Sequence, residues 1–311
     1  MSRILISGGS GYIGSVLVGH LLGAGHSVTV LDRLMWGQRS LFGYCRDPKF
    51  DFVFGDARDE RVLSGLVSAH DIIIPLAALV GAKLCDQDPI SAQAVNYQAI
   101  ETLIKLRSPS QPVIFPCTNS GYGTRSGDMF CTEETPLEPI SVYGVTKVQA
   151  ERLLLSNPGT ISLRLATVFG VSPRMRLDLL VNDFVYRAVT DRFLVLYERH
   201  FKRNYLHIDD VAGAFIHAID HFDQMKGEAY NVGLNEANLS KEELALKIKE
   251  HVPQLYIHNA EVGSDPDKRN YIVSNEKIAK KGFRASNSID KGIRDLIKAY
   301  RMIQGSELSN A

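Results

Sequence analysis

The sequence predicts an α/β fold: a doubly wound parallel sheet covered by helices on both faces, followed by a smaller α/β lobe. From residue 1 to about residue 170, short apolar runs typical of buried strands alternate with segments that carry apolar residues at helical spacing. Repeated strand–helix units join through right-handed crossovers, which place their strands parallel in one sheet. After Gly170 the alternation loosens, and helical stretches are separated by short, isolated strands. That change marks the start of the lobe.

Six apolar runs supply the strands expected in the sheet: Ile4–Ile6, Ser27–Leu31, Phe50–Phe54, Asp71–Ile74, Pro112–Pro116 and Thr160–Arg164. The expected helices of this half are Tyr12–Leu22, Asp88–Leu106 and Ser141–Leu155. Those of the lobe are Leu177–Arg192, Asp209–His221, Ser240–His251 and Ile289–Met302. We therefore divide the chain into residues 1–170 and a lobe of residues 171–311, from which some chain crosses back to the sheet. The polar tail Gly305–Ala311 is expected to fray.

Three glycines, Gly8, Gly11 and Gly14, separate the first strand from the first helix. A strand, a glycine turn and a helix in this order are typical of a dinucleotide site. Glycine has no Cβ, so the backbone can approach a pyrophosphate closely, and the helix start at Tyr12 and Ile13 offers it free N–H groups. A tight turn without a ligand is the alternative. In a parallel sheet the ligand lies beyond the carboxyl ends of the strands, which predicts a Rossmann-type nucleotide site here.

Asp32 indicates which dinucleotide binds. It follows the second apolar run, about 20 residues after the glycines. A carboxylate at this position accepts hydrogen bonds from both ribose hydroxyls and repels a 2′-phosphate, so NAD is favoured over NADP. Arg33, the next residue, works against that preference.

The composition excludes several other classes of function. The formal net charge is zero, so nothing in the sequence points to nucleic acid or to an anionic membrane surface. No apolar run approaches the roughly 20 residues of a membrane span, and the N-terminus leads directly into a strand, which leaves no room for a signal peptide. The four cysteines lie far apart without metal-ligand spacing, so we expect free thiols, no metal and a cytoplasmic location.

Tyr143 and Lys147 are the second feature on which the predicted function depends. At a spacing of four residues on one helix, the phenol and the ammonium share a face. A free phenol has a pKa of about 10, too high for a base at neutral pH, but a neighbouring ammonium and a positive nicotinamide ring would both lower it. Tyr143 could then take a hydroxyl proton while hydride leaves the same carbon for NAD. Taken alone, such a pair is usually part of a solvated helix surface.

A polar turn, residues 117–123, follows the fifth expected strand. A hydroxyl here would hydrogen-bond the reacting oxygen, and Thr118 and Ser120 are both candidates on chemistry alone. The alternative is a polar turn that satisfies its own backbone.

Together these motifs resemble those of the extended short-chain dehydrogenases/reductases, the group of NAD-dependent nucleotide-sugar epimerases and dehydratases. The resemblance covers nearly the whole chain. It implies that Tyr143 and Lys147 are the catalytic pair and that Thr118, rather than Ser120, is the catalytic hydroxyl. Pro75 replaces the histidine of the family's His-x-Ala-Ala motif. The residues implied to bind the cofactor are Gly8, Gly11, Tyr12, Ile13, Gly14, Asp32, Asp56, Ala57, Leu76, Ala77, Ala78, Asn96, Tyr143 and Lys147.

The same resemblance places the substrate at the junction with the lobe. Segments 164–170 and 203–210 are similar to two family motifs, and the arginine of the second grips the diphosphate of the sugar nucleotide. Thr167 replaces the asparagine usual in the first motif. Arginines in loops of a neutral protein are otherwise typical of solvated surface. The residues implied to bind the substrate are Leu79, Val80, Asn119, Ser120, Thr167, Arg174, Arg176, Asn182, Arg203 and Arg269.

Two positions at which this chain departs from the family's dehydratases bear on the reaction. Family dehydratases have an Asp–Glu pair after the catalytic threonine, whereas Asn119 and Ser120 stand here, and neither is a general acid at neutral pH. We therefore predict oxidation of a nucleotide-sugar hydroxyl at C4 without loss of water. Segments 118–123 and 172–184 are similar to a subgroup that includes a GDP-heptose 4-dehydrogenase of surface-polysaccharide synthesis.

Two outcomes share the 4-keto intermediate. Release of the ketone makes a dehydrogenase, and return of the hydride to the other face makes a 4-epimerase; the sequence does not choose between them. A 4,6-dehydratase and a non-catalytic NAD-sensing regulator are weaker alternatives, the second because such regulators lack the Tyr–Lys pair. The resemblance also implies at least a homodimer, with candidate contact residues on the helices over 88–106 and 141–155: Ala92, Ala99, Val148 and Leu155.

Overall fold

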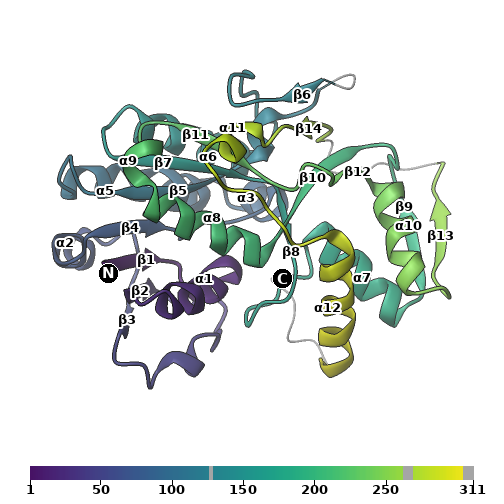
Figure 1. Cartoon of the computed structure of the whole chain (residues 1–311), viewed down its shortest axis with the longest axis horizontal. Helices are drawn as coiled ribbons and strands as arrows, with labels where there is room; N and C mark the ends of the chain where they lie inside the picture. The colour runs from purple at the N-terminus through teal and green to yellow at the C-terminus, as the bar shows by residue number, and fades with distance from the viewer. Residues whose placement is uncertain (126–128, 262–268, 304–311) are drawn as a thin grey trace.

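The computed structural model describes residues 1–125, 129–261 and 269–303, so the prediction for the tail 305–311 lies outside the described residues. Its main feature is a seven-stranded parallel sheet in the order β11-β7-β5-β4-β1-β2-β3, which confirms the predicted Rossmann-type α/β class (Figure 1). The order reverses between β1 and β4, where ligands bind in such sheets. The strands are β1 Arg3–Ser7, β2 Ser27–Asp32, β3 Phe50–Phe54, β4 Ile72–Pro75, β5 Val113–Thr118, β7 Thr160–Leu165 and β11 Ala229–Val232.

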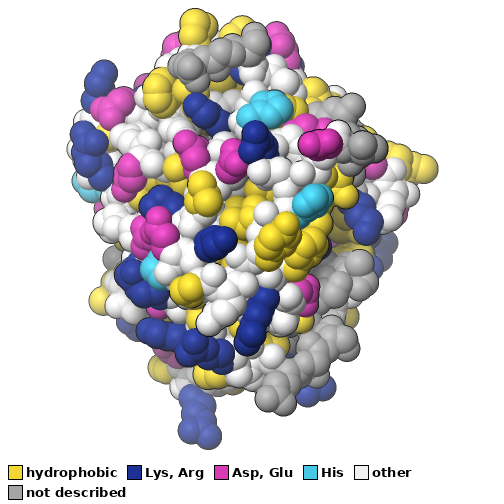
Figure 2. Space-filling view, turned by 90° about the vertical axis from the view of Figure 1, so that its right-hand side faces the viewer, with side chains coloured by type: hydrophobic (Ala, Val, Ile, Leu, Met, Phe, Trp, Pro, Cys, Tyr) yellow, Lys and Arg dark blue, Asp and Glu magenta, His cyan; other side chains and the backbone are white. Residues whose placement is uncertain are grey.

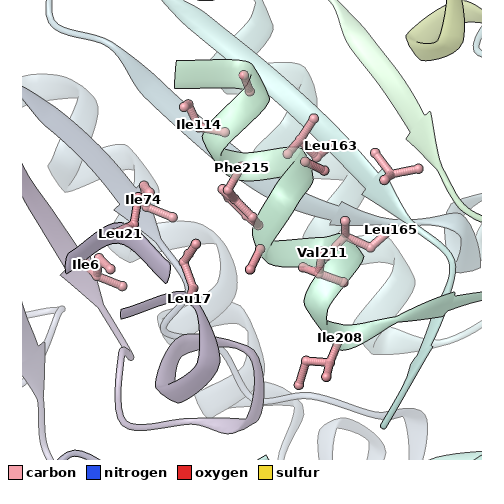
Figure 3. Close-up of a cluster of buried hydrophobic side chains, with 14 of the residues drawn as sticks. Ile6, Leu17, Leu21, Ile74, Ile114, Leu163, Leu165, Ile208, Val211 and Phe215 are labelled. Carbon is pink, nitrogen blue, oxygen red and sulfur yellow. The ribbon is translucent and has the colours of Figure 1, made fainter. Parts of the chain in front are cut away.

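Helices cover both faces of this sheet. Helices α1 (Tyr12–Gly23) and α8 (Ile208–Asp220) cover one face. Helices α2 (Glu60–Ala69), α5 (Ala99–Leu106) and α6 (Val142–Leu155) cover the other. Burial on both faces is the reason the strands read as continuous apolar runs. Figure 3 shows the apolar core between α1, α8 and the strands, built from Ile6, Leu17, Leu21, Ile74, Ile114, Leu163, Leu165, Ile208, Val211 and Phe215.

The lobe has its own apolar core, enclosed by α7 (Leu180–Thr190), α10 (Lys241–His251) and α12 (Ile289–Met302). Figure 2 views its outer face, where acidic, basic and hydrophobic side chains are interspersed, so this face carries no field of a single sign. Small sheets flank the core: β8 Thr167–Phe169 with β10 Lys202–His207 and β12 Asn238–Ser240, β9 Phe193–Leu196 with β13 Tyr256–Asn259, and β6 Phe130–Cys131 with β14 Ile272–Val273.

The structure differs from the sequence prediction in several elements. Strand β11 and helix α8 follow residue 170 yet belong to the sheet layers, so the domain boundary at 170 stays a proposal. The helix expected over 88–106 is divided by a π-helical turn, which inserts a wider turn at Asn96. Helix α2 was not predicted, although Asp59 caps it by accepting from the N–H of Arg61 at 2.9 Å. The other helices are η1 Phe42–Tyr44, α3 Ala82–Gln87, α4 Pro89–Gln93, η2 Ala94–Gln98, η3 Asn119–Tyr122, α9 Phe222–Met225 and α11 Glu276–Lys280.

Three global properties bear on function. No helix within the described ranges is long and apolar enough to cross a membrane. The same ranges hold no group of three or more His, Cys, Asp or Glu side chains placed to bind a metal ion. All four cysteines are free thiols, as the sequence predicts.

Candidate active site

The glycine turn after β1 has the close backbone packing that its sequence predicts. Gly8 has a φ of +77°, and a Cβ on this residue would lie 2.5 Å from the backbone nitrogen of Ala77. A Cβ on Gly14 would lie 2.6 Å from the Cα of Gly9. On Gly11 it would meet only one carbonyl oxygen of the described residues, at 3.2 Å. The first turn of α1 has no acidic side chain, so an anion beside Gly11 would meet free N–H groups and the positive end of the helix dipole.

Tyr12 joins this turn to the lobe. Its hydroxyl donates to the carbonyl of Gly170 at 2.8 Å and accepts from Nδ2 of Asn182 at 3.2 Å. Asn182 is fully buried, and its amide also accepts from the N–H of Gly170 at 3.1 Å and donates to the carbonyl of Arg176 at 3.0 Å. The Tyr12 hydroxyl and the Asn182 amide therefore join the lobe to the sheet. The contacts expected of these two residues with cofactor and substrate stay predictions.

Asp32 lies at the end of β2, beside the glycine turn. Its carboxylate accepts from the backbone N–H of Ser10 at 3.0 Å and of Leu34 at 2.8 Å. Burial raises its pKa, and these N–H bonds oppose that rise. A carboxylate has about four acceptor sites, so capacity for ribose hydroxyls remains. Arg33 bonds Asp56, with 3.1 Å between Nη1 and Oδ2, and its side chain stays 51% exposed.

The substitution Asp32→Ala removes an acceptor and a negative charge together. We expect NAD affinity to fall at least about tenfold, because a hydrogen bond to a charged group contributes about 1.5–3 kcal/mol, and NADP affinity to rise. Titrations followed by the fluorescence of Trp36, the single tryptophan, measure both. Asp51→Ala, at an exposed carboxylate on β3, is the control. Equal affinity of the wild-type protein for NAD and NADP would contradict this role of Asp32.

Asn96 holds the loop that follows β4. Its Oδ1 accepts from the N–H of Leu79 at 2.8 Å, while Nδ2 donates to the carbonyl of Leu79 at 3.0 Å and to Oγ1 of Thr146 at 3.1 Å. The side chain is buried and its amide bonds both the loop and α6, and its expected contact with the cofactor stays a prediction. Leu76 begins the loop and donates its N–H to the carbonyl of Ser7 at 2.8 Å.

Several other residues predicted to bind a ligand lie at the carboxyl ends of the strands or at the junction with the lobe. Ala57 and Ala77 line one small apolar pocket at the carboxyl ends of β3 and β4. Ala78 and Val80 are half-buried in the loop after β4, and Thr167 is half-buried at the start of β8. Their contacts with cofactor or substrate stay predictions.

Lys147 is almost completely enclosed. Only 4% of it is exposed, and its Nζ lies 3.9 Å from the centre of the Phe115 ring. Burial lowers the pKa of Lys147 to about 8, although the nearby Cys117 and Glu151 counteract that effect. The ammonium is therefore held in a place where its charge is screened little by water.

Tyr143 differs from its prediction in pKa. Burial raises the pKa of Tyr143 to about 12, and the charges of Arg176 and Arg269 offset only part of that rise. Removing water from a phenol disfavours its charged form. Side chains alone therefore leave the pKa of this phenol above the range of a base at neutral pH.

Thr118 ends β5 and caps η3. Its Oγ1 accepts from the N–H of Ser120 at 3.1 Å and donates to Oγ of Ser120 at 3.0 Å. The guanidinium of Arg269 also donates to that Ser120 oxygen. A Cβ on Gly144 would lie 3.5 Å from the carbonyl oxygen of Ser120, so the turn packs against α6 one residue from Tyr143. The fold thus brings a hydroxyl, a phenol and an arginine to one place.

Arg176 reaches the site from the lobe. It forms an ion pair with Asp178. Its Nη2 lies 3.9 Å from the position of a Cβ on Gly81, in the loop after Val80. Its charge also lowers the pKa of Tyr143. Arg176 is therefore close both to the loop after β4 and to helix α6, which carries Tyr143.

Of the remaining substrate candidates, Arg203 and Asn119 are buried and Arg174 is half-buried. Arg203 is 3% exposed, donates from Nη1 to the carbonyl of Lys202 at 3.0 Å and lies 5.6 Å from the ring centre of Tyr271. Arg174 donates from Nη1 to the carbonyl of Met175 at 2.9 Å. Asn119 is buried, and neither atom of its amide has a hydrogen-bond partner among the described residues.

Sequence reasoning missed one feature of this region. Glu151 on α6 and Arg164 on β7 form a buried ion pair, with 2.7 Å between Oε1 and Nη2. The sequence did contain a sign of this pair. Glu151 follows Lys147 by one helical turn, which places its carboxylate on the helix face of Tyr143 and Lys147.

Comparisons with known proteins identify the family. The model of the NAD dependent epimerase/dehydratase family matches residues 4–233. The chain is 30% identical to the low-salt glycan biosynthesis protein Agl12 of Haloferax volcanii, over 96% of this chain and 98% of that protein. A UDP-glucose 4-epimerase from Thermotoga maritima, solved with UDP-glucose, has a TM-score of 0.85 and 22% identity, covering 96% of this chain and 99% of that one. A dTDP-glucose 4,6-dehydratase from Streptomyces venezuelae, solved with NAD and TYD, has a TM-score of 0.85 and 24% identity, covering 96% and 97%. Its curated relatives include a UDP-glucose 4-epimerase of Lacticaseibacillus casei and a dTDP-glucose 4,6-dehydratase of Actinoplanes. With the glycine turn, the Tyr–Lys helix and the threonine turn in place, this chain belongs to the NAD dependent epimerase/dehydratase family.

Proposed function

We propose that this protein is an NAD-dependent 4-dehydrogenase that oxidises the C4 hydroxyl of a nucleotide sugar and does not remove water. One observation carries the proposal. The turn that holds Thr118 packs against the start of the helix that holds Tyr143 and Lys147, at the same edge of the sheet as the glycine turn, which follows β1 two strands away. A hydroxyl, a phenol and an ammonium are the groups that hydride removal from an alcohol requires.

The residues present fit NAD as the cofactor. Gly11 has no Cβ to keep a pyrophosphate away from the start of α1, Asp32 ends β2 for the ribose, and Lys147 would hold the second ribose. NAD would accept the hydride, and its positive nicotinamide would favour the phenolate form of the tyrosine. Tyr143 would take the proton from the C4 hydroxyl while Thr118 holds the same oxygen by a hydrogen bond.

The lobe supplies arginines suited to a nucleoside diphosphate. Arg203 lies on β10, and the charges of Arg176 and Arg269 act on Tyr143. A guanidinium binds phosphate oxygens with two parallel hydrogen bonds, which suits these residues and Arg174 to a diphosphate. The relatives solved with UDP-glucose and TYD support a nucleotide-sugar substrate, and the relative named for glycan biosynthesis supports a role in polysaccharide sugar synthesis. A GDP-heptose is the first sugar to test. Because free thiols are typical of proteins in a reducing compartment, the four free cysteines support a cytoplasmic location.

We expect the product to keep its C6 oxygen. Elimination of water needs a general acid beside C6, and Asn119 and Ser120 occupy the positions where family dehydratases place one. Asp178 does not replace it, because bonding to Arg176 outweighs the effect of burial and keeps the pKa of this carboxyl below its usual value. Mass spectrometry of the product checks this: loss of two hydrogens or no change in mass agrees with the proposal, and loss of one water contradicts it.

The 4-epimerase is the second candidate, and the similarity to the Thermotoga maritima epimerase favours it. The two reactions share their first step and differ in the fate of the 4-keto sugar. Proton NMR of the product separates them, because an epimerase gives a mixture of C4 isomers of unchanged mass, whereas a dehydrogenase gives the ketone and free NADH.

We also propose a homodimer formed through α4, η2, α5 and α6. Three of the contact residues expected from the sequence, Ala92, Ala99 and Val148, are buried within the chain and do not supply a surface. Ile90 and Val145 replace them, since they are 82% and 38% exposed on α4 and α6. We expect light scattering at micromolar concentration to give the mass of a dimer and Ile90→Glu to give that of a monomer. A monomeric wild-type protein would contradict the proposal.

The substrate can be identified with a panel of nucleotide sugars. Each is added with NAD, and NADH absorbance and the melting temperature are recorded. The substrate should raise both signals, and Tyr143→Phe should keep the shift in melting temperature while losing the NADH signal. A panel that covers UDP-, dTDP- and GDP-sugars, GDP-heptose included, and gives neither signal would count against the proposed function.

A further inference from the structure

The ion pair between Glu151 and Arg164 is the centre of a buried hydrogen-bond network. Oε1 of Glu151 accepts from Nη2 of Arg164 at 2.7 Å and from its Nε at 3.0 Å. Oε2 accepts from the hydroxyl of Ser162 at 2.6 Å. The side chains of Glu151 and Arg164 are 1% and 8% exposed, so water does not reach the pair to any extent. The carboxylate of α6 is therefore fixed to two residues of the same strand, β7.

Arg164 continues this network to the threonine turn. Its Nη1 donates to the hydroxyl of Tyr122 at 3.1 Å and to the carbonyl of Glu133 at 3.1 Å. Tyr122 is the last residue of η3, the helix that Thr118 caps, and it is fully buried. Its own hydroxyl reaches Oδ1 of Asn231 on β11 at 2.7 Å. The guanidinium of Arg164 thus bonds both helix α6, through Glu151, and the Thr118 turn, through Tyr122.

Stability alone is a poor explanation for this arrangement. Removing two charges from water costs about as much as their attraction returns, so buried ion pairs contribute little net stability compared with apolar residues of the same shape. What the network supplies is geometry. The hydrogen bonds of a carboxylate, a guanidinium fork and a buried phenol fix the relative positions of α6, β7, β11 and η3.

We propose that Glu151, Arg164 and Tyr122 are positioning residues that fix the Thr118 turn relative to the helix of Tyr143 and Lys147. The inference rests on the proposed oxidation of a sugar hydroxyl, in which Thr118 and Tyr143 must meet the same oxygen. A displacement of about 1 Å at a reacting centre costs on the order of a hundredfold in rate. Tyr122 touches neither reacting group and acts through the turn.

The substitution Tyr122→Phe tests this with little change in volume, because it removes only the hydroxyl that Arg164 and Asn231 bind. Tyr230→Phe is the matched control: Tyr230 is equally buried, lies on β11 and loses a hydroxyl that donates to the carbonyl of Met225 at 3.3 Å, outside the network. We expect kcat to fall by roughly ten- to a hundredfold in Tyr122→Phe with unchanged KM for NAD and sugar, and to stay at the wild-type value in the control. Equal kcat in the two variants would overturn the proposal.

A second readout does not depend on turnover. The N–H of Ser120 bonds Oγ1 of Thr118, and the N–H of Gly123 bonds the carbonyl of Ser120 at 3.3 Å, so hydrogen exchange of a peptide over 119–123 reports the order of the turn. Exchange should become faster in Tyr122→Phe and in Arg164→Lys, and stay unchanged in Tyr230→Phe. Unchanged exchange in all three variants overturns the positioning role. If the wild-type protein oxidises no nucleotide sugar, the proposed function fails, while exchange still decides whether the network orders the turn.

Discussion

The substitution Tyr143→Phe is expected to lower the rate of hydride transfer by about a hundred- to ten-thousandfold, the usual contribution of a positioned base. The ring and its packing remain, and only the proton acceptor is lost. NAD affinity should be retained, because the glycine turn, Asp32 and Lys147 are untouched. Single-turnover formation of NADH measures the rate, and quenching of Trp36 fluorescence measures NAD binding in the same samples.

Tyr230→Phe is the control for this variant as well, since it removes a buried tyrosine hydroxyl in the core on the α1 and α8 face of the sheet, opposite the face that α6 covers. Its rate should equal that of the wild-type protein. If Tyr143→Phe turned over at the wild-type rate, the phenol would not be the base, and another acceptor of the hydroxyl proton would be required.

The substitution Arg164→Met should reduce the free energy of unfolding by about 3–5 kcal/mol, because it leaves the carboxylate of Glu151 buried without its cation. The loss is much larger than the net contribution of the pair, since an uncompensated buried charge has no water to solvate it. Glu151→Gln combined with Arg164→Met should recover part of the loss by removing the charge. Urea denaturation followed by circular dichroism measures these free energies.

Arg187→Met is the comparison for that experiment. Arg187 pairs with Asp183 at 2.8 Å on α7, but its side chain is 53% exposed, so the expected loss is about 0–1 kcal/mol. Similar losses for Arg164→Met and Arg187→Met would show that burial of the Glu151–Arg164 pair has no energetic consequence.

Most of the fold could be predicted because its sheet is buried on both faces. Each central strand is then an apolar run between polar turns, and the ends of β1, β2 and β5 also carry the residues on which the nucleotide and catalytic predictions depend. The glycine turn was predictable because its backbone admits no other residue. Gly8 has a positive φ, and a Cβ on it would lie 2.5 Å from the backbone nitrogen of Ala77.

The direction of individual side chains was not predictable, because it depends on contacts between segments far apart in the sequence. Tyr12 and Asn182 are 170 residues apart, yet they bond each other across the junction of the sheet and the lobe. Asn96 likewise bonds Leu79 and Thr146. The pKa of Tyr143 depends on burial, which spacing on a helix does not reveal.

Transfer of deuterium from C4 of a labelled nucleotide sugar to NAD tests the central claim most directly. The wild-type protein, in excess over substrate, is mixed with NAD and each C4-deuterated sugar of the panel and quenched within a single turnover. With its substrate, the account predicts deuterated NADH together with a 4-keto sugar that retains its C6 oxygen. NAD that binds but gains no deuterium from any sugar of the panel, GDP-heptose included, would contradict it.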